Sequence, residues 1–212
     1  MFFQNLWHNP ILGFFVLVSM VIGISVHEYS HAKAADELGD PTPRSMGRLT
    51  LNPKVHLDIL GTFSLLIFGF GWGKPVVFDP FNLKNPRRDA AIISLAGPLS
   101  NLMLAGFAAF FSKLLTLLFV SNSLLYLYLG LFLYFFAGIN LMLAFFNLVP
   151  IYPLDGFKIV EGLLPEEKVH QWQELASYGT VLLLLFILPF SGRSLASKTI
   201  GVMVNFFLGL LF

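Results

Sequence analysis

Long stretches of apolar residues, separated by short polar segments, dominate the sequence. Four apolar runs approach or exceed the length of a membrane span, at about 11–34, 90–119, 124–149 and 174–190, and the last of these is short. A fifth run, at about 199–212, is also short. A helix needs roughly 20 apolar residues to cross a bilayer core, so the runs predict membrane-spanning helices. The expected fold class is an all-α polytopic membrane protein with about five to six membrane segments.

The stretch between the first and second runs breaks this pattern. Residues 35–58 and 73–89 are rich in Pro, Gly, Asn and charged residues, which is typical of loops, and RLTL at 48–51 could form a short strand. Residues 59–72 are apolar but too few for an untilted span, and they include Gly61, Gly69 and Gly71. We therefore expect a re-entrant or short β segment near 59–72. It must lie against protein, because lipid cannot satisfy open backbone.

The composition agrees with a membrane protein. Of 212 residues, 56% are hydrophobic and 12% are charged, whereas soluble domains carry roughly 25% charged residues. This argues against a soluble enzyme, a DNA-binding domain or a disordered tail, and makes the lipid bilayer the expected surroundings. The net charge of +1 gives no sign of a nucleic-acid partner. Because the chain has no Cys, any metal site must use His, Asp or Glu.

The basic residues predict how the chain is oriented. Ten of the thirteen Lys and Arg residues fall within 32–89 and 150–172. The positive-inside rule then places these segments in the cytosol and the N-terminus outside. Residues 1–10 contain no Lys or Arg, so we expect the first run to be a retained membrane helix rather than a signal peptide. The expected location is the cell membrane, with several passes through it.

The first apolar run ends in a costly cluster of ionisable residues, HEYSH at 27–31. An ionisable side chain at membrane depth costs roughly 2.5–3.5 kcal/mol on insertion scales, so stability does not explain the cluster. His27 and His31 are four residues apart, which places both imidazoles on one helix face within reach of one ion. Glu28 lies beside them and could reach a water molecule at that ion. This is the HExxH pattern of zinc with a carboxylate general base.

A catalytic zinc needs a third protein ligand and an open position for water. Asp155 is favoured because Pro150, Pro153 and Gly156 break the chain around it, and an unwound stretch at membrane depth must line a cavity. Asp155 returns to the same side of the membrane as His31 only if residues 59–72 do not fully cross. The full set of third-ligand candidates contains His56, Asp58, Asp79, Asp89, Asp155, Glu161 and His170.

Three motifs together resemble one protein family. They are HEYSH at 27–31, AGPLSN at 96–101 and NLVPIYPLDG at 147–156. In this order they resemble the site-2 protease family of intramembrane zinc metalloproteases, in a minimal form without PDZ-like or CBS-like domains. The resemblance implies a single integral membrane peptidase domain over 1–212. Its catalytic core would cover about 11–156, followed by C-terminal helices at 157–212.

The resemblance also implies roles for single residues. His27, His31 and Asp155 would hold one Zn²⁺ per chain, Glu28 would be the catalytic base, and Asn147 could donate to the oxyanion. Zinc would activate the water molecule that attacks the peptide bond. The expected partners are transmembrane protein or peptide substrates, and the residues that bind them are not indicated.

The leading hypothesis is therefore an intramembrane zinc metalloprotease that hydrolyses peptide bonds within transmembrane segments, with its active site toward the cytosol. The alternative is a non-enzymatic metal-binding membrane protein or transporter, which would keep the ligands but would not need Glu28. A third possibility, a pseudoprotease that binds membrane helices, conflicts with the intact HEYSH motif and Asp155. The roles of His56 and Asp58 stay open, either near the zinc or in a turn.

Overall fold

Three long apolar helices form the frame of the molecule. The computed structural model describes residues 9–61, 64, 71–118, 123–189, 192 and 194–212. Within these residues, α1 (Pro10–Glu37), α5 (Pro86–Leu118) and α6 (Leu124–Asn147) are long and apolar enough to cross a membrane. They confirm three of the predicted runs, and the protein is a helical membrane protein.

Helix α1 begins and ends for local reasons. The side chain of Asn9 caps its first turn by accepting the backbone N–H groups of Ile11 and Leu12 at 3.2 and 3.3 Å, and Pro10 occupies the first helical position. With 28 residues the helix is about 42 Å long. That exceeds a hydrocarbon core of about 30 Å, so an untilted helix would extend beyond it.

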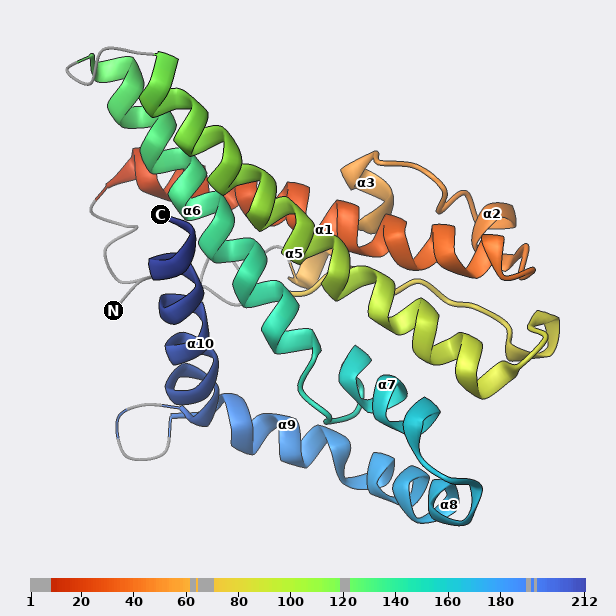
Figure 1. The fold of residues 1–212 in the computed structure, drawn as a ribbon. Helices are drawn as coiled ribbons and strands as arrows, with labels where there is room; N and C mark the ends of the chain where they lie inside the picture. Colours follow the sequence, from red (N-terminus) through yellow and green to blue (C-terminus); the bar gives the residue numbers. More distant parts are fainter. Residues whose placement is uncertain (1–8, 62–63, 65–70, 119–122, 190–191, 193) are drawn as a thin grey trace.

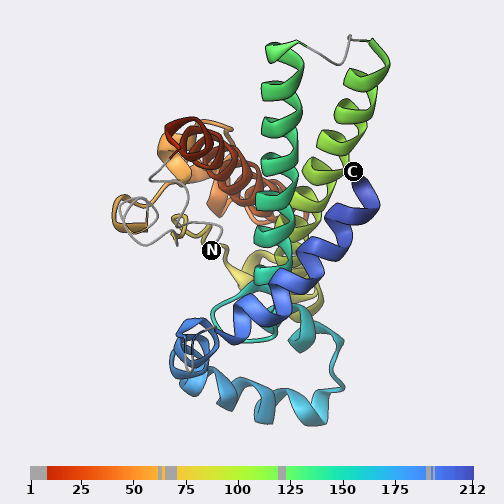
Figure 2. The ribbon, with the colours of Figure 1, turned by 90° about the vertical axis from the view of Figure 1, so that its left-hand side faces the viewer.

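Helices α5 and α6 form an antiparallel pair, and α1 crosses this pair (Figures 1 and 2). Small side chains fill the contact between α5 and α6, where Ala105, Ala108 and Ala137 are buried. Small residues let membrane helices approach closely, which favours packing where lipid offers no hydrophobic driving force. Val16, Met20 and Ile24 of α1 pack in a second cluster with Ile139 of α6.

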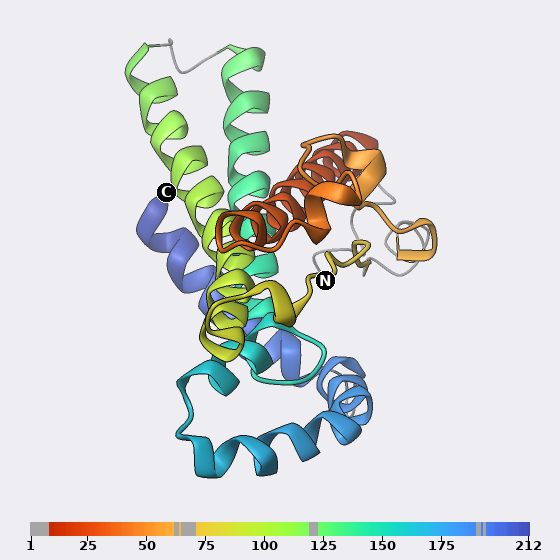
Figure 3. The ribbon, with the colours of Figure 1, turned by 90° about the vertical axis from the view of Figure 1, so that its right-hand side faces the viewer.

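The C-terminal part consists of shorter helices. They are α7 (Asp155–Leu163), α8 (Glu166–Glu174), η2 (Leu175–Tyr178), α9 (Gly179–Ile187) and α10 (Leu195–Leu211). Figure 3 shows α8 and α9 at the lower end of the molecule, with α10 rising from there. Helix α10 packs against α6, and α8 is polar and has no buried residue.

The predicted fourth span at 174–190 is not confirmed. The helix α9 has only nine residues, and it is preceded by the 3₁₀ turn η2. At its start, the backbone of Gly179 lies so close to Tyr152 that a Cβ there would be 2.6 Å from the Tyr152 carbonyl oxygen. At its end, Leu188 is extended before Pro189, as expected of a residue before proline. Helix α10, at 17 residues, is also shorter than the three long helices, so five to six spans are not confirmed.

The polar loops are held together by side chains and short turns. They contain α2 (Thr42–Ser45), α3 (Pro53–His56) and η1 (Pro80–Asn82). The strand that residues 48–51 could have formed is absent from the described chain: Leu49 and Thr50 form bends, and the N–H groups of Arg48 and Thr50 donate to the carbonyl oxygens of Pro43 and Arg48. Instead the guanidinium of Arg48, which is 3% exposed, donates to the carbonyl oxygens of Val55 and Lys74 at 2.7 and 3.1 Å. A buried side chain thus joins loop segments that lie on either side of residues 59–72.

The segment predicted to be re-entrant or β is only partly described. Residues 62–63 and 65–70 lie outside the described residues, and the described part of the chain forms no strand there. On either side of the segment, Leu57 and Gly73 form an isolated antiparallel bridge, and the Lys74 N–H donates to the His56 carbonyl oxygen at 2.7 Å. The chain therefore enters and leaves this segment at neighbouring points beside α1. A re-entrant path is not confirmed by this observation alone.

Candidate metal centre and active site

Three residues of the HEYSH motif face the interior of the helix assembly. His27, Glu28 and His31 are only 6%, 9% and 8% exposed. They lie on the part of α1 that packs against α5, as expected for a helix whose polar face turns toward protein. The spacing argument is therefore confirmed at the level of the helix, because both imidazoles point to the same side.

Asp155, the first residue of α7, meets these two imidazoles. Its Oδ2 lies 3.1 Å from Nε2 of His27 and 3.3 Å from Nε2 of His31, and the two Nε2 atoms are 3.0 Å apart. In the part of the chain that the structure describes, these residues form the group of His and acidic side chains able to hold a metal ion. Two residues of the first long helix and one from a distant short helix thus form one site.

The hydrogen bonds of the two Nδ1 atoms determine which ring nitrogen of each histidine can bind a metal. Nδ1 of His27 lies 2.7 Å from Oδ1 of Asn101, and Nδ1 of His31 lies 2.7 Å from the carbonyl oxygen of Ile93. Both partners are acceptors, so each Nδ1 carries the proton and each Nε2 presents a lone pair. The two lone pairs and the Asp155 carboxylate converge on one point, an arrangement that a cation stabilises.

These donors fit zinc. Tetrahedral zinc with bonds of about 2.0–2.1 Å holds its ligand atoms about 3.3 Å apart. The donor atoms of His27, His31 and Asp155 lie 3.0–3.3 Å from one another. Two imidazoles and a carboxylate are also the donor set of a catalytic zinc site with one open position. No thiolate is needed, which agrees with the absence of Cys from the sequence.

Two glycines let the three elements approach this closely. A Cβ on Gly97 of α5 would lie 2.5 Å from Nε2 of His31 and 2.7 Å from Cε1 of His27, closer than real contacts allow. A Cβ on Gly156, directly after Asp155, would overlap the carbonyl oxygens of Leu148 and Val149. Glycine is required at both positions by close approach rather than by backbone conformation.

Glu28 is held beside the centre by the polar loop. Its Oε2 accepts the backbone N–H of Val76 at 3.0 Å, and a Cβ on Gly73 would lie 3.4 Å from its Oε1. The loop therefore lies against Glu28 and orients its carboxylate. Glu28 is not part of the three-residue metal group, which agrees with its predicted separation from the ligands.

The other predicted residues lie in different surroundings. Asn147 ends α6, and its Nδ2 donates to the carbonyl oxygen of Leu143 at 3.0 Å, so the described contacts do not test its expected role at the oxyanion. Each of the remaining third-ligand candidates contacts a different residue outside the metal group. Those contacts are His56 with Thr50, Asp58 with Gly61, Asp79 with Phe81, Asp89 with Asn85, Glu161 with Gln173 and His170 with Glu174.

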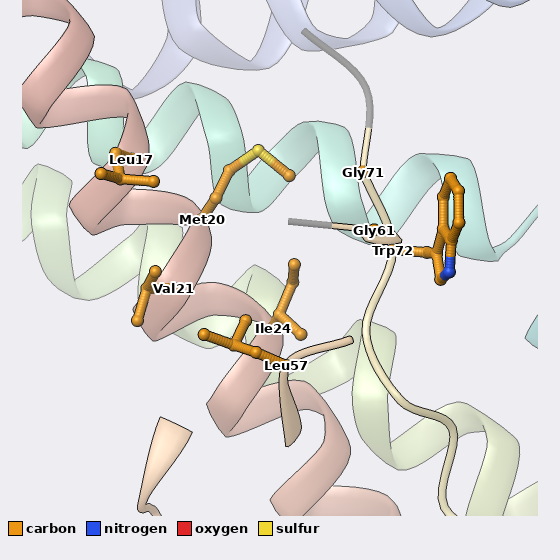
Figure 4. A pocket seen from close by; sticks show the side chains of 8 residues that line it. All are labelled: Leu17, Met20, Val21, Ile24, Leu57, Gly61, Gly71 and Trp72. Atoms are coloured by element: carbon orange, nitrogen blue, oxygen red, sulfur yellow. The ribbon is translucent and has the colours of Figure 1, made fainter. Parts of the chain in front are cut away.

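An apolar pocket lies along α1, one to three turns before Glu28. Figure 4 shows Met20 and Ile24 directed toward the segments that contain Gly61 and Gly71. Gly73 separates this pocket from Glu28, because a Cβ there would touch both Ile24 and Glu28. The lining residues are Leu17, Met20, Val21, Ile24, Leu57, Gly61, Gly71 and Trp72.

Sequence reasoning missed several partners of the site. The buried Asn140 of α6 bonds Asn101, and the N–H of Val76 bonds Glu28. An Asn in an otherwise apolar run is a signal that could have drawn attention to Asn140, because a polar side chain at membrane depth needs a partner. No sequence signal points to the Val76 N–H, since any residue except proline supplies one.

The fold and the site together define a helical membrane protein with the donor set of a zinc hydrolase. Comparisons with known proteins agree. Residues 118–188 match the model of Peptidase family M50. A Bacillus subtilis (strain 168) protein named "Putative zinc metalloprotease YwhC" is 39% identical over 178 residues, covering 82% of this chain and 81% of its own length.

Two further relatives carry the same designation. Rip2 of Mycobacterium tuberculosis (strain ATCC 25618 / H37Rv) is 31% identical over 192 residues, covering 84% of this chain and 69% of its own. MJ0611 of Methanocaldococcus jannaschii is 39% identical over 104 residues, covering 49% of this chain and 50% of its own. The chain therefore belongs to peptidase family M50, the site-2 protease family. No solved structure matches the chain.

Proposed function

We propose that this protein is an intramembrane zinc endopeptidase that cuts transmembrane segments of other membrane proteins. The observation that carries the proposal is the meeting of His27, His31 and Asp155 with Glu28 beside them, inside a frame of membrane helices. When bound at these ligands, zinc would lower the pKa of a water molecule and polarise the scissile carbonyl. The relatives named as zinc metalloproteases support the choice of metal.

Glu28 is the proposed general base. Its Oε2 is held by the Val76 N–H, which leaves Oε1 to accept a proton from the attacking water. Glu28 then returns that proton to the leaving nitrogen of the cleaved bond. Asn147 is the proposed donor to the oxyanion. For this its amide would turn from Leu143, because in the structure it is bonded there.

The substrate is a membrane helix that unwinds locally. A helical peptide bond is shielded by its own hydrogen bonds, so the scissile region must be extended to reach the site. The neighbouring bridge of Leu57 and Gly73 supports a re-entrant path for residues 59–72.

We also propose that the site opens toward the cytosol of the cell membrane. The exposed bases near the site, among them Lys74 and Lys84, support this orientation through the positive-inside rule. Water and the catalytic proton would then be exchanged from the cytosolic side.

The test uses purified protein in liposomes with two synthetic membrane peptides. One has an uninterrupted apolar helix of Leu and Ala, and the other has a central Asn-Gly pair that weakens the helix. We expect wild type to cleave the second peptide, and Glu28→Gln to cleave it at least 100-fold more slowly while keeping its zinc. Mass spectrometry of the products measures both. Cleavage by Glu28→Gln at the wild-type rate would contradict the proposed base.

If the wild-type protein keeps its zinc but cleaves neither peptide nor any other membrane segment offered to it, the result favours the non-enzymatic metal-binding alternative. In that alternative Glu28 has no chemical role. The Glu28→Gln variant therefore separates a protease from a binding protein with the same ligands.

A further inference from the structure

A chain of buried amides connects the three long helices and ends at the metal centre. Asn101 of α5 and Asn140 of α6 are both 0% exposed. The Asn101 Nδ2 donates to the Asn140 Oδ1 at 2.9 Å and to the carbonyl oxygen of Gly23 in α1 at 3.1 Å. The Asn101 Oδ1 lies 2.7 Å from Nδ1 of His27.

Backbone carbonyl oxygens fix the direction of every hydrogen bond made by these two amides. The Asn140 Nδ2 donates to the carbonyl oxygen of Phe136 at 2.8 Å, and a carbonyl can only accept. The Asn140 Oδ1 must therefore face Asn101, and the Asn101 Nδ2 must face the carbonyl of Gly23. Only the Asn101 Oδ1 is left for His27, so the ring can meet it only with a protonated Nδ1.

Helix packing makes room for this chain. A Cβ on Gly23 would lie 3.0 Å from the Asn140 Oδ1 and 2.8 Å from Cδ1 of Leu143. The absence of a side chain at Gly23 thus lets α1 approach the amide pair on α5 and α6. A buried amide is costly in an apolar interior unless it is fully paired, and here both amides are paired on both ends.

We propose that Asn101 is a positioning residue for the metal ligand His27, and that Asn140 sets the orientation of the Asn101 amide. The Asn101 Oδ1 holds the proton on Nδ1 of His27, which directs the Nε2 lone pair at the metal. Partners of this kind tune ligand basicity and ring orientation in metal sites. The role rests on the proposed function, because it requires that the site binds zinc. It goes beyond that function by placing a determinant of metal affinity on a residue that touches neither metal nor substrate.

The test measures zinc affinity by chelator competition in purified, detergent-solubilised protein. Asn101→Leu removes the acceptor, and we expect zinc to bind about 10- to 100-fold more weakly. Asn101→Asp keeps an acceptor for Nδ1 of His27 but loses both donor bonds, and we expect it to recover most of the affinity. Asn140→Leu frees the Asn101 amide to turn, and we expect a smaller loss than for Asn101→Leu.

Two further measurements separate positioning from packing. The unfolding midpoint reports the structural cost of each variant, and the visible spectrum of the cobalt-substituted protein reports the geometry of the ligands. Positioning predicts that Asn101→Asp unfolds at lower temperature than wild type, because it lacks two bonds, yet keeps a wild-type cobalt spectrum. Asn101→Leu should alter the spectrum.

Equal loss of zinc in Asn101→Leu and Asn101→Asp, in step with their unfolding midpoints, would overturn the proposal in favour of packing alone. Zinc affinity of Asn101→Leu within threefold of wild type would also overturn it. A wild-type protein that binds no zinc would instead contradict the proposed function itself, so the two failures are distinguishable.

Discussion

Gly97 faces both imidazoles of the metal centre from α5, and its missing side chain leaves space for them. In Gly97→Ala the new methyl would press on His31 and His27, so we expect at least a tenfold loss of zinc affinity by chelator competition. The matched control is Gly106→Ala on the same helix, where a Cβ meets nothing within 4 Å. Wild-type zinc affinity in Gly97→Ala would show that the imidazoles do not lie where the structure places them.

Asp40 is a buried carboxylate that holds the polar loops together. It accepts hydrogen bonds from Thr42, from the Asp79 N–H and from Asn82. Burial opposes ionisation, but these hydrogen bonds outweigh it and lower the pKa of Asp40. The carboxylate therefore stabilises the fold above the unfolded pKa of about 3.9, and this contribution is lost as the pH falls through the lower folded value.

We expect Asp40→Asn to lower the free energy of unfolding by on the order of 2–3 kcal/mol at pH 7, because donors are left unpaired. The difference from wild type should shrink as the pH falls below about 4 toward the lower folded pKa, where the folded wild-type carboxylate also becomes protonated. Denaturant unfolding in detergent at several pH values measures this. Glu37→Gln, in an exposed pair with Lys33, is the control and should change stability little. A difference independent of pH would contradict the role of the charge.

At the scale of residues, the sequence predicts the metal ligands and the base better than it predicts the groups that hold them in place. Helix periodicity predicts that His27 and His31 share one helix face with Glu28 beside them. The prolines and the glycine around Asp155 favour this residue as the third ligand. Asn140 and the Val76 N–H could not be predicted in the same way. Their partners lie 39 and 48 residues away in the chain, and only the packing of α5 against α6 and of the polar loop against α1 brings them together.

At the scale of elements, the position of Asp155 depends on how α7 begins. The first turn of α7 lies directly on the backbone at Leu148 and Val149, and only Gly156 fits there. Further along, Gly162 brings α7 against Ala91 of α5. Helix α7 is thus held at both ends against the helices that carry or surround the two histidines.

Gly156→Ala should therefore shift Asp155 and weaken zinc binding at least tenfold, although no ligand is changed. Equilibrium dialysis against zinc measures the loss. Gly209→Ala in α10 is the control, because a Cβ there meets nothing within 4 Å. If Gly156→Ala bound zinc like wild type, the first turn of α7 would not be what places Asp155.

The elements also show where hydrophobic runs predict helices and where they fail. Runs of more than twenty apolar residues become α1, α5 and α6 because few alternatives satisfy their backbone in lipid. The run at 174–190 is already short for a span, and Gly179 and Pro189 further divide it into a 3₁₀ turn and a nine-residue helix. A hydropathy profile reflects only amino-acid composition. The breaks at Gly179 and Pro189 depend on contacts with Tyr152 and on local backbone geometry.

At the scale of the whole molecule, the orientation of the chain can be tested directly because the sequence has no Cys. Single cysteines can replace the exposed residues Asn52, Lys84, Ser123 and Lys168. We expect a membrane-impermeant maleimide to label positions 52, 84 and 168 from the cytosolic face and position 123 from the other. Labelling of positions 52 and 84 from opposite faces would mean that residues 59–72 cross the membrane.

The central claim is that α1 and α7 together hold one zinc ion for hydrolysis inside the membrane. Elemental analysis of purified wild type, His31→Ala, Asp155→Ala and Glu28→Gln tests it most directly. We expect about one zinc per chain in wild type and in Glu28→Gln, and a large loss in the other two, because three protein ligands hold a catalytic zinc. Full zinc content in Asp155→Ala would contradict the site, since the structure places its Oδ2 3.1 and 3.3 Å from the Nε2 atoms of His27 and His31, as a third ligand atom.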